Sequence, residues 1–255
     1  MQIGKWGGES FGLLPAHEAL HVNIPGLTHC PPRFTAQPAI EPLPPLTQIG
    51  GTCYAFATVN YLRYTCQNLP QRSGLALGWL AQKILGMGDE SASAAVVGGG
   101  HVRAAIGAAL AWGLPAEEDH RDIDDNIEVR NNRIFAKKPS VQAVMGAFYD
   151  ARLCYDSMHQ LRVSEAQDLA EQGIPSIICL PVTDEIDKAA KDGTTLTGEG
   201  RIIGGHVWVL LGRNILQSTW GACGRDGMGL FEATDGYLSK GFDLWTGVPI
   251  WAKQS

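Results

Sequence analysis

The apolar residues of the chain change their spacing near its middle. In the first half they recur three and four positions apart, and the run "CYAFATVNYLRYTC" predicts a buried helix that begins at Cys53 and ends near Cys66. Two more helices are expected in "LALGWLAQKILGMG" and "HVRAAIGAALAWGLPAEED", the second ending at Gly113 and Pro115. This half is therefore predicted to be helical.

The second half contains short runs of β-branched and aromatic residues separated by glycine or asparagine. The runs "SIICLPV", "GHVWVLLG" and "NILQSTWG" are typical of an antiparallel sheet. One helix is expected before them, in "SEAQDLAEQGIP", with Ser164 as its N-cap and Gly173 at its end. The run "SVQAVMGAFYDARLCYDSM" fits either a helix or a strand. The pattern predicts an α+β fold, with a helical half packed on a β-rich half and a cleft between them.

The start of the chain differs from the rest in composition. Residues 1–50 are rich in proline and glycine, which disfavours long regular elements. We expect residues 1–40 to form an extended arm and residues 41–255 to form one two-lobed domain. Within it, the helical lobe is expected over about 50–140 and the β-rich lobe over about 141–250.

Composition and charge narrow the class of protein. Of the 255 residues, 45% are apolar and 18% are charged, which allows a sizeable core. The net charge of -6 and the lack of a Lys/Arg run provide no basic surface for nucleic acid or an anionic membrane. No uncharged apolar run approaches the roughly 20 residues of a membrane span. We therefore expect neither partner, and a cytoplasmic location in the producing cell.

The cysteines point to chemistry at one position. The six cysteines have no CxxC pair and no repeated spacing, so neither a zinc ribbon nor a disulfide framework is indicated. Cys66, Cys154 and Cys179 stand in apolar runs and are expected to be buried, reduced thiols. Cys53 differs, because it stands where the polar, glycine-rich "LTQIGGT" meets the first helix.

A thiol at the first turn of a helix can act as a nucleophile. The helix end favours the thiolate, and its unpaired N–H groups can bind an oxyanion. Gln48 adds an amide donor, while Gly50 and Gly51 allow a tight turn that aims it. A base is also needed, and His206 begins an apolar strand of the other half, in "IIGGHVWVLLG".

These segments resemble the papain-like cysteine peptidases. "QIGGTCYAF" is similar to their active-site segment, in which Gly, a small residue and Cys precede Trp or Tyr. "GGHVWVLLGRNILQSTWG" resembles their histidine strand and the next strand, with "STWG" in place of Asn-Ser-Trp-Gly. "GGGHVRAAIGAALAWGLPAEED" resembles the segment whose glycine pair lines the substrate groove. Cys53 and His206 are 153 residues apart, near the family separation of about 130 to 150.

The resemblance implies a papain-like two-lobed fold and thiol-dependent hydrolysis of peptide or isopeptide bonds in a polypeptide substrate. It implies no metal or organic cofactor. Cys53 would be the nucleophile, His206 its base, Gln48 an oxyanion donor and Ser218 the residue that orients the imidazole. The residues expected on the substrate side are Gly99, Gly100, Gly205 and Trp220.

Three positions depart from the family pattern. Gln48 lies five residues before the cysteine, where the family has six. The orienting asparagine aligns with Ser218, and Gln217 is the alternative if the strand slips by one residue. The cysteine expected three residues before the nucleophile is Gly50, and its partner is replaced around Gly98, which fits a reducing compartment.

Other functions stay open. The same thiol could serve an acyl transferase, and the Ser218 departure keeps open a catalytically inactive binding module. "HEALH", residues 17–21, matches the HExxH zinc motif of metallopeptidases. The glycines and prolines around it disfavour the long helix that this motif needs.

Overall fold

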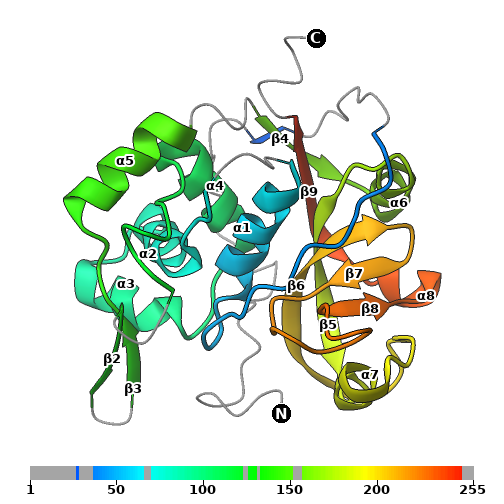
Figure 1. Ribbon diagram of the computed structural model, residues 1–255. Helices are drawn as coiled ribbons and strands as arrows, with labels where there is room; N and C mark the ends of the chain where they lie inside the picture. The colour runs from blue at the N-terminus through cyan, green and yellow to red at the C-terminus, as the bar shows by residue number, and fades with distance from the viewer. Residues whose placement is uncertain are drawn as a thin grey trace.

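The first half of the chain is helical, as the spacing predicts. The computed structural model describes residues 27–28, 37–65, 70–122, 126–130, 133–151 and 157–248. Its helices in this half are α1 Cys53–Thr65, α2 Gly74–Ile84, α3 Asp89–Val96, α4 Val102–Trp112 and α5 Val141–Ala151. An antiparallel hairpin of β2 Ile127–Arg130 and β3 Arg133–Ala136 packs beside α3 (Figure 1).

The second half is built on a seven-stranded sheet. Its spatial order is β1 Leu27–Thr28, β4 Ser157–Leu161, β9 Phe242–Val248, β5 Ser176–Thr183, β6 Ile202–Gly212, β7 Ile215–Gln217 and β8 Leu230–Glu232. All neighbours are antiparallel except β1 and β4. The helices of this half are α6 Val163–Glu171, α7 Ile186–Asp192 and α8 Asp235–Leu238.

The two faces of the sheet bury two separate hydrophobic clusters. Because side chains alternate along a strand, Val207 and Val209 of β6 join the cluster that contains α1, whereas Trp208 and Leu210 join the other. Helix α6 packs on this second side. Neighbouring residues of β6 therefore belong to different environments.

Helix α1 joins the two halves. It contacts α2 and α4 on one side and β5 and β6 on the other, and Figure 1 shows it between the helices and the sheet. Its first ten residues, Cys53 to Leu62, are all buried. This stretch is enclosed on all sides and needs no polar face, and only Thr58 and Asn60 among its ten residues are polar.

The segment before α1 crosses the β-rich half. The N–H of Gln37 donates to Gln172 O, just beyond α6, at 2.7 Å. Farther along, Gly221 N–H donates to Leu46 O at 3.0 Å, and Thr47 forms a bridge with Trp220. Residues 37–52 thus tie the sheet to the start of α1, as the blue trace in Figure 1 shows. Most of the arm expected over 1–40 lies outside the described residues.

Two sequence expectations change in detail. Helix α6 begins at Val163 with Arg162 as its N-cap, so the expected cap Ser164 lies inside the helix. The Glu165 carboxylate accepts the Arg162 N–H at 2.8 Å, which makes the earlier start favourable. The ambiguous run resolves into α5 and β4, and α5 packs on α4, so the helical half continues to Ala151.

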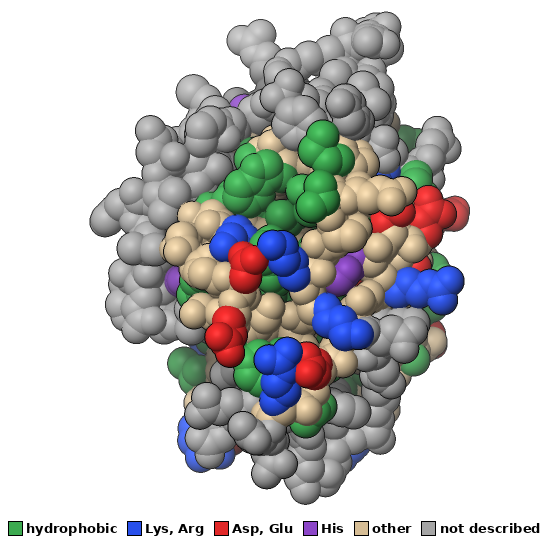
Figure 2. Space-filling view, turned by 90° about the vertical axis from the view of Figure 1, so that its left-hand side faces the viewer, with side chains coloured by type: hydrophobic (Ala, Val, Ile, Leu, Met, Phe, Trp, Pro, Cys, Tyr) green, Lys and Arg blue, Asp and Glu red, His purple; other side chains and the backbone are tan. Residues whose placement is uncertain are grey.

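The surface carries charges of both signs. On the face with α3 and α5, Figure 2 shows Lys and Arg side chains close to Asp and Glu side chains. Within the described residues, no helix is long and apolar enough to cross a membrane.

Candidate active site

The turn before α1 places Cys53 at the first position of the helix. The Thr52 hydroxyl donates to Ile49 O at 2.8 Å and accepts from the Ile49 N–H at 3.2 Å, which closes the turn. The first helical hydrogen bonds run from the N–H groups of Ala55 and Phe56 to Thr52 O. The earliest N–H groups of a helix have no intrahelical acceptor. Those of Cys53 and Tyr54 act on the Cys53 sulfur, where they lower the thiol pKa.

Gln48 is fixed beside this turn. Its Nε2 donates to Gly50 O at 2.7 Å, and its Oε1 accepts from the Thr219 hydroxyl at 2.6 Å. Its own N–H donates to Thr219 O at 2.7 Å. Gln48 is thus held between the turn and the "STWG" segment, with one amide hydrogen left to serve as an oxyanion donor.

Glycine is required at position 50. Its φ is +56°, and a Cβ there would lie 2.8 Å from Val97 O. The next residue, Gly51, donates its N–H to Val97 O at 2.8 Å. A backbone hydrogen bond therefore joins the turn to the end of α3, in the region where the resemblance expects a disulfide.

His206 lies in β6, and its ring packs against two tryptophans of the cluster that contains Trp208. Its ring stacks on Trp220 with centroids 4.0 Å apart and meets Trp208 edge-on at 4.8 Å. The side chain is fully buried, and neither ring nitrogen has a hydrogen-bond partner within the described part of the chain. Burial lowers the pKa of His206 well below its usual range.

Ser218 and Gln217 point to opposite faces of the sheet. The Gln217 amide is occupied on the α1 side, where its Oε1 accepts from Asn60 Nδ2 at 2.8 Å and from the Tyr64 hydroxyl at 2.6 Å. Ser218 Oγ instead lies 3.8 Å from Cys223 Sγ, in the cluster that contains Trp208. Of these two residues, Ser218 shares the face of His206, although no hydrogen bond joins it to the ring.

The Cys53 thiol lies against the backbone of β6. It is fully buried, and burial raises its pKa to about 12, although N–H groups of Val207, Tyr54 and Cys53 itself lower it in part. Val207 directly follows His206. Burial thus favours the neutral form of both groups.

The glycines expected along the groove lie under other side chains. Gly100 packs on Tyr54, since a Cβ there would lie 2.5 Å from the Tyr54 ring, and Gly99 O accepts from Gln82 Nε2 at 3.1 Å. Both glycines are buried. Gly205 pairs with Pro181 across β6 and β5. The substrate contacts of these glycines and of Trp220 stay predictions.

Some of the expected chemistry falls outside the described residues. This applies to "HEALH" at 17–21 and to Cys30, Cys66 and Cys154. Cys179, the other cysteine expected to be buried, is fully buried and reduced. Among the described residues, no group of three or more His, Cys, Asp or Glu side chains is placed to hold a metal ion.

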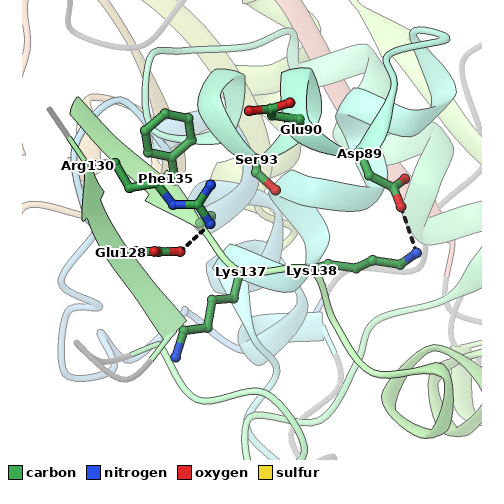
Figure 3. Close-up of a pocket in the computed structure, with 9 residues that line it drawn as sticks. Asp89, Glu90, Ser93, Glu128, Arg130, Phe135, Lys137 and Lys138 are labelled. Atoms are coloured by element: carbon green, nitrogen blue, oxygen red, sulfur yellow. Dashed lines mark hydrogen bonds and ion pairs between the residues drawn. The ribbon is translucent and has the colours of Figure 1, made fainter.

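A cavity of about 410 Å³ lies apart from these residues, between α3 and the β2–β3 hairpin (Figure 3). Two ion pairs lie along it: Lys138 contacts Asp89 at 2.7 Å, and Arg130 contacts Glu128 at 2.6 Å. None of the expected site residues lines it.

The structure adds two residues that the sequence did not single out. Thr219 anchors Gln48, and Cys223 contacts Ser218. The position of Thr219 inside "STWG" was a signal for its proximity to the site. Nothing in the sequence indicated Cys223, because its contact depends on the turn of the loop that follows.

Comparisons with known proteins agree with this architecture. No protein-family model and no curated protein matches the chain. Among solved structures, it is similar to xylellain, a cysteine protease from Xylella fastidiosa, with 16% identity, a TM-score of 0.69, and coverage of 97% of this chain and 98% of that one. It is also similar to procathepsin B S9 from Trypanosoma congolense, with 14% identity, a TM-score of 0.60, and coverage of 94% and 87%.

A third similar structure is a cysteine protease of Carica candamarcensis, with 12% identity, a TM-score of 0.54, and coverage of 81% and 92%. At these identities the likeness concerns the fold. The predicted α+β fold of the papain-like type is confirmed.

Proposed function

We propose that the protein is a thiol-dependent peptidase with Cys53 as nucleophile and His206 as its base. The observation that carries this proposal is the position of Cys53, at the first turn of α1 and against the backbone of the residue that follows His206, within a papain-like fold. Gln48, fixed by Thr219, and Trp220, stacked on His206, support it.

The reaction would begin with transfer of the Cys53 proton to His206. The sulfur would then attack the substrate carbonyl carbon, and the resulting oxyanion would accept hydrogen bonds from the Cys53 N–H and Gln48 Nε2. Collapse would break the carbon–nitrogen bond as His206 protonates the leaving amine. Water, deprotonated by His206, would hydrolyse the thioester and regenerate the thiol.

Burial sets a condition on this chemistry. Because both side chains are fully buried, the site must open before substrate can reach the sulfur. Contact with water would relieve the desolvation that keeps both groups neutral and would favour the thiolate–imidazolium pair. A site that stays closed would instead correspond to the inactive binding module, and the observation that favours this alternative is the buried His206 ring, whose nitrogens have no hydrogen-bond partner among the described residues.

Alkylation separates the two functions. Iodoacetamide at pH 6, followed by mass spectrometry of peptides, compares buried Cys53 with half-buried Cys223. A peptidase that opens and forms a thiolate should label first at Cys53, despite its burial. Labelling of Cys223 with Cys53 unmodified would support the binding module.

Hydrolysis itself tests the nucleophile. Cys53→Ala should remove all turnover of a fluorogenic peptide library, because the proposed thioester forms on the Cys53 sulfur. Cys179→Ala is the matched control, since Cys179 is a buried thiol of the same cluster and should remain active. Circular dichroism checks that both variants fold. More than a few per cent of activity in Cys53→Ala would refute the assignment.

The substrate class and location follow from this proposal. A polypeptide is the expected partner, and the free thiols of Cys53, Cys179 and Cys223 in the described residues support a cytoplasmic location. Adding a primary amine during turnover distinguishes a transferase, which would yield an amide product, from a hydrolase, which would yield only the acid.

A further inference from the structure

The loop after β7 holds a thiol against the Ser218 hydroxyl. Cys223 Sγ lies 3.8 Å from Ser218 Oγ, and the Trp220 N–H donates to the same oxygen at 3.2 Å. The backbone of Cys223 is fixed on both sides, because its N–H donates to Gly221 O at 2.9 Å and its carbonyl accepts from the Gly229 N–H at 2.8 Å. This contact is built into the loop.

Ser218 is the residue that aligns with the orienting position, and the histidine it would orient has no hydrogen-bond partner among the described residues. His206 is fully buried, and its ring nitrogens make no hydrogen bond to any described residue. Trp220 stacks on its ring, and both Trp220 and Cys223 pack against the cluster of Trp208, which lies on the His206 face. Ser218 is thus joined to Cys223 directly and to His206 only through Trp220, which donates to its hydroxyl and stacks on the imidazole.

A serine oxygen has two acceptor sites and one proton. The Trp220 N–H takes one acceptor site, and the Cys223 thiol takes either the other site or the proton. When the thiol is the donor, both acceptor sites of the Ser218 oxygen are taken and none is left for the imidazole N–H. Because a thiol is a weak hydrogen-bonding group, the contact can be broken at low cost during turnover.

We propose that Cys223 is a positioning residue, which competes with His206 for the Ser218 hydroxyl and so limits how well the imidazole is oriented. This inference rests on the proposed peptidase function. The thiol acts on the reaction only through Ser218, and its strength as a hydrogen-bonding group sets how readily the hydroxyl turns toward His206.

Two substitutions of Cys223 should act in opposite directions. Cys223→Ala removes the competitor and should raise kcat by about two- to fivefold with KM unchanged, as expected for a modest hydrogen bond. Cys223→Ser supplies a stronger competitor of nearly the same shape and should lower kcat. A purely structural role would lower activity in both variants or in neither.

The double variant locates the effect. In a Ser218→Ala background, Cys223→Ala should leave kcat unchanged, because there is no hydroxyl to release. A hydrogen bond from the imidazolium also raises the histidine pKa, so the limb of the pH profile that reports His206 should move up in Cys223→Ala and down in Cys223→Ser.

An NMR titration of the His206 ring in labelled protein reads the same contact without turnover. If peptide hydrolysis is absent but this titration shifts between the Cys223 variants, the proposed function fails and the competition stands. If wild type hydrolyses peptides and the Cys223 variants match it in kcat and in the His206 titration, the competition is overturned and the function stands.

Discussion

At the scale of single residues, the choice between Ser218 and Gln217 is decided by which face of the sheet each side chain occupies. Sequence alone leaves both open, because a slip of one residue exchanges them. The structure places Gln217 among side chains of α1 and Ser218 beside Cys223. We therefore expect different consequences from removing each side chain.

Ser218→Ala should slow turnover with little effect on stability. If Ser218 bonds to the imidazole during turnover, losing this orienting hydrogen bond should cost about 1 to 2 kcal/mol of transition-state stabilisation, roughly a tenfold drop in kcat. Ser218→Asn should restore or exceed the parent rate, because a planar amide restricts the imidazole more than a rotating hydroxyl. Steady-state kinetics on the three proteins provide the measurement, and an unchanged kcat in Ser218→Ala would exclude the orienting role.

Gln217→Ala should lower the stability of the protein and leave turnover nearly unchanged. The Gln217 side chain donates to Leu43 O and Met228 O at 2.8 and 2.9 Å and accepts from Asn60 and Tyr64. Its loss therefore leaves several buried polar groups without a hydrogen-bond partner. We expect the free energy of unfolding to fall by about 2 to 4 kcal/mol. The kcat of the folded protein should stay within about twofold. Urea denaturation and kinetics together check this, and a stable but slow variant would contradict it.

At the scale of elements, the junction of α1 with the start of α4 depends on a close approach at Gly100. A Cβ at this position would lie 2.5 Å from the Tyr54 ring, which is fully buried next to Cys53. Gly98 offers a matched comparison two residues earlier, because the nearest atom to its Cβ would be Ala95 O at 3.6 Å.

Gly100→Ala should therefore destabilise the protein by about 1 to 3 kcal/mol, as overpacking does in a dense core. Gly98→Ala should stay within about 0.5 kcal/mol of the parent, as an exposed substitution usually does. Thermal unfolding of the two variants is the measurement. Equal melting temperatures would mean that the Tyr54 ring moves aside without loss of stability.

The helices and strands differ in how well the sequence predicts them. Helices α1, α2 and α4 and strands β5 and β6 were predictable, because each has a strong local pattern. Helix α3 and the β2–β3 hairpin were not, since α3 has only eight residues with two of them buried, and the hairpin depends on packing beside α3. The alternation along β6 shows why the contacts of Cys53 and His206 need the three-dimensional register.

At the scale of the whole molecule, buried titratable groups link stability to pH. Burial lowers the pKa of His206 well below its usual range and that of His120 to about 4, and Lys137 adds to the effect at His120. In the unfolded chain a histidine titrates near 6.5. As the pH falls below about 6.5, the unfolded state therefore binds protons that the native state does not, and stability is lost.

Asp122 has the opposite effect on how stability changes with pH. It accepts hydrogen bonds from the Ser73 hydroxyl and the N–H groups of Gly74 and Leu75, yet burial raises its pKa to about 6. An unfolded aspartate titrates near 3.9. Between about pH 6 and 4 the native state thus binds a proton that the unfolded state lacks, which offsets one of the two histidines.

The balance predicts a net loss of stability on acidification from pH 7.5 to 5. Two histidines oppose one aspartate, so the slope should approach about 1.4 kcal/mol per pH unit for the one unmatched proton. Urea denaturation at pH 7.5, 6 and 5 measures it. His120→Asn should flatten the dependence by removing one uncompensated proton, while Asp122→Asn should steepen it by removing the offset. A free energy of unfolding that is constant or rises toward pH 5 would contradict this prediction. It would mean that these groups are more hydrated in solution than in this structure, and that the site around His206 opens without substrate.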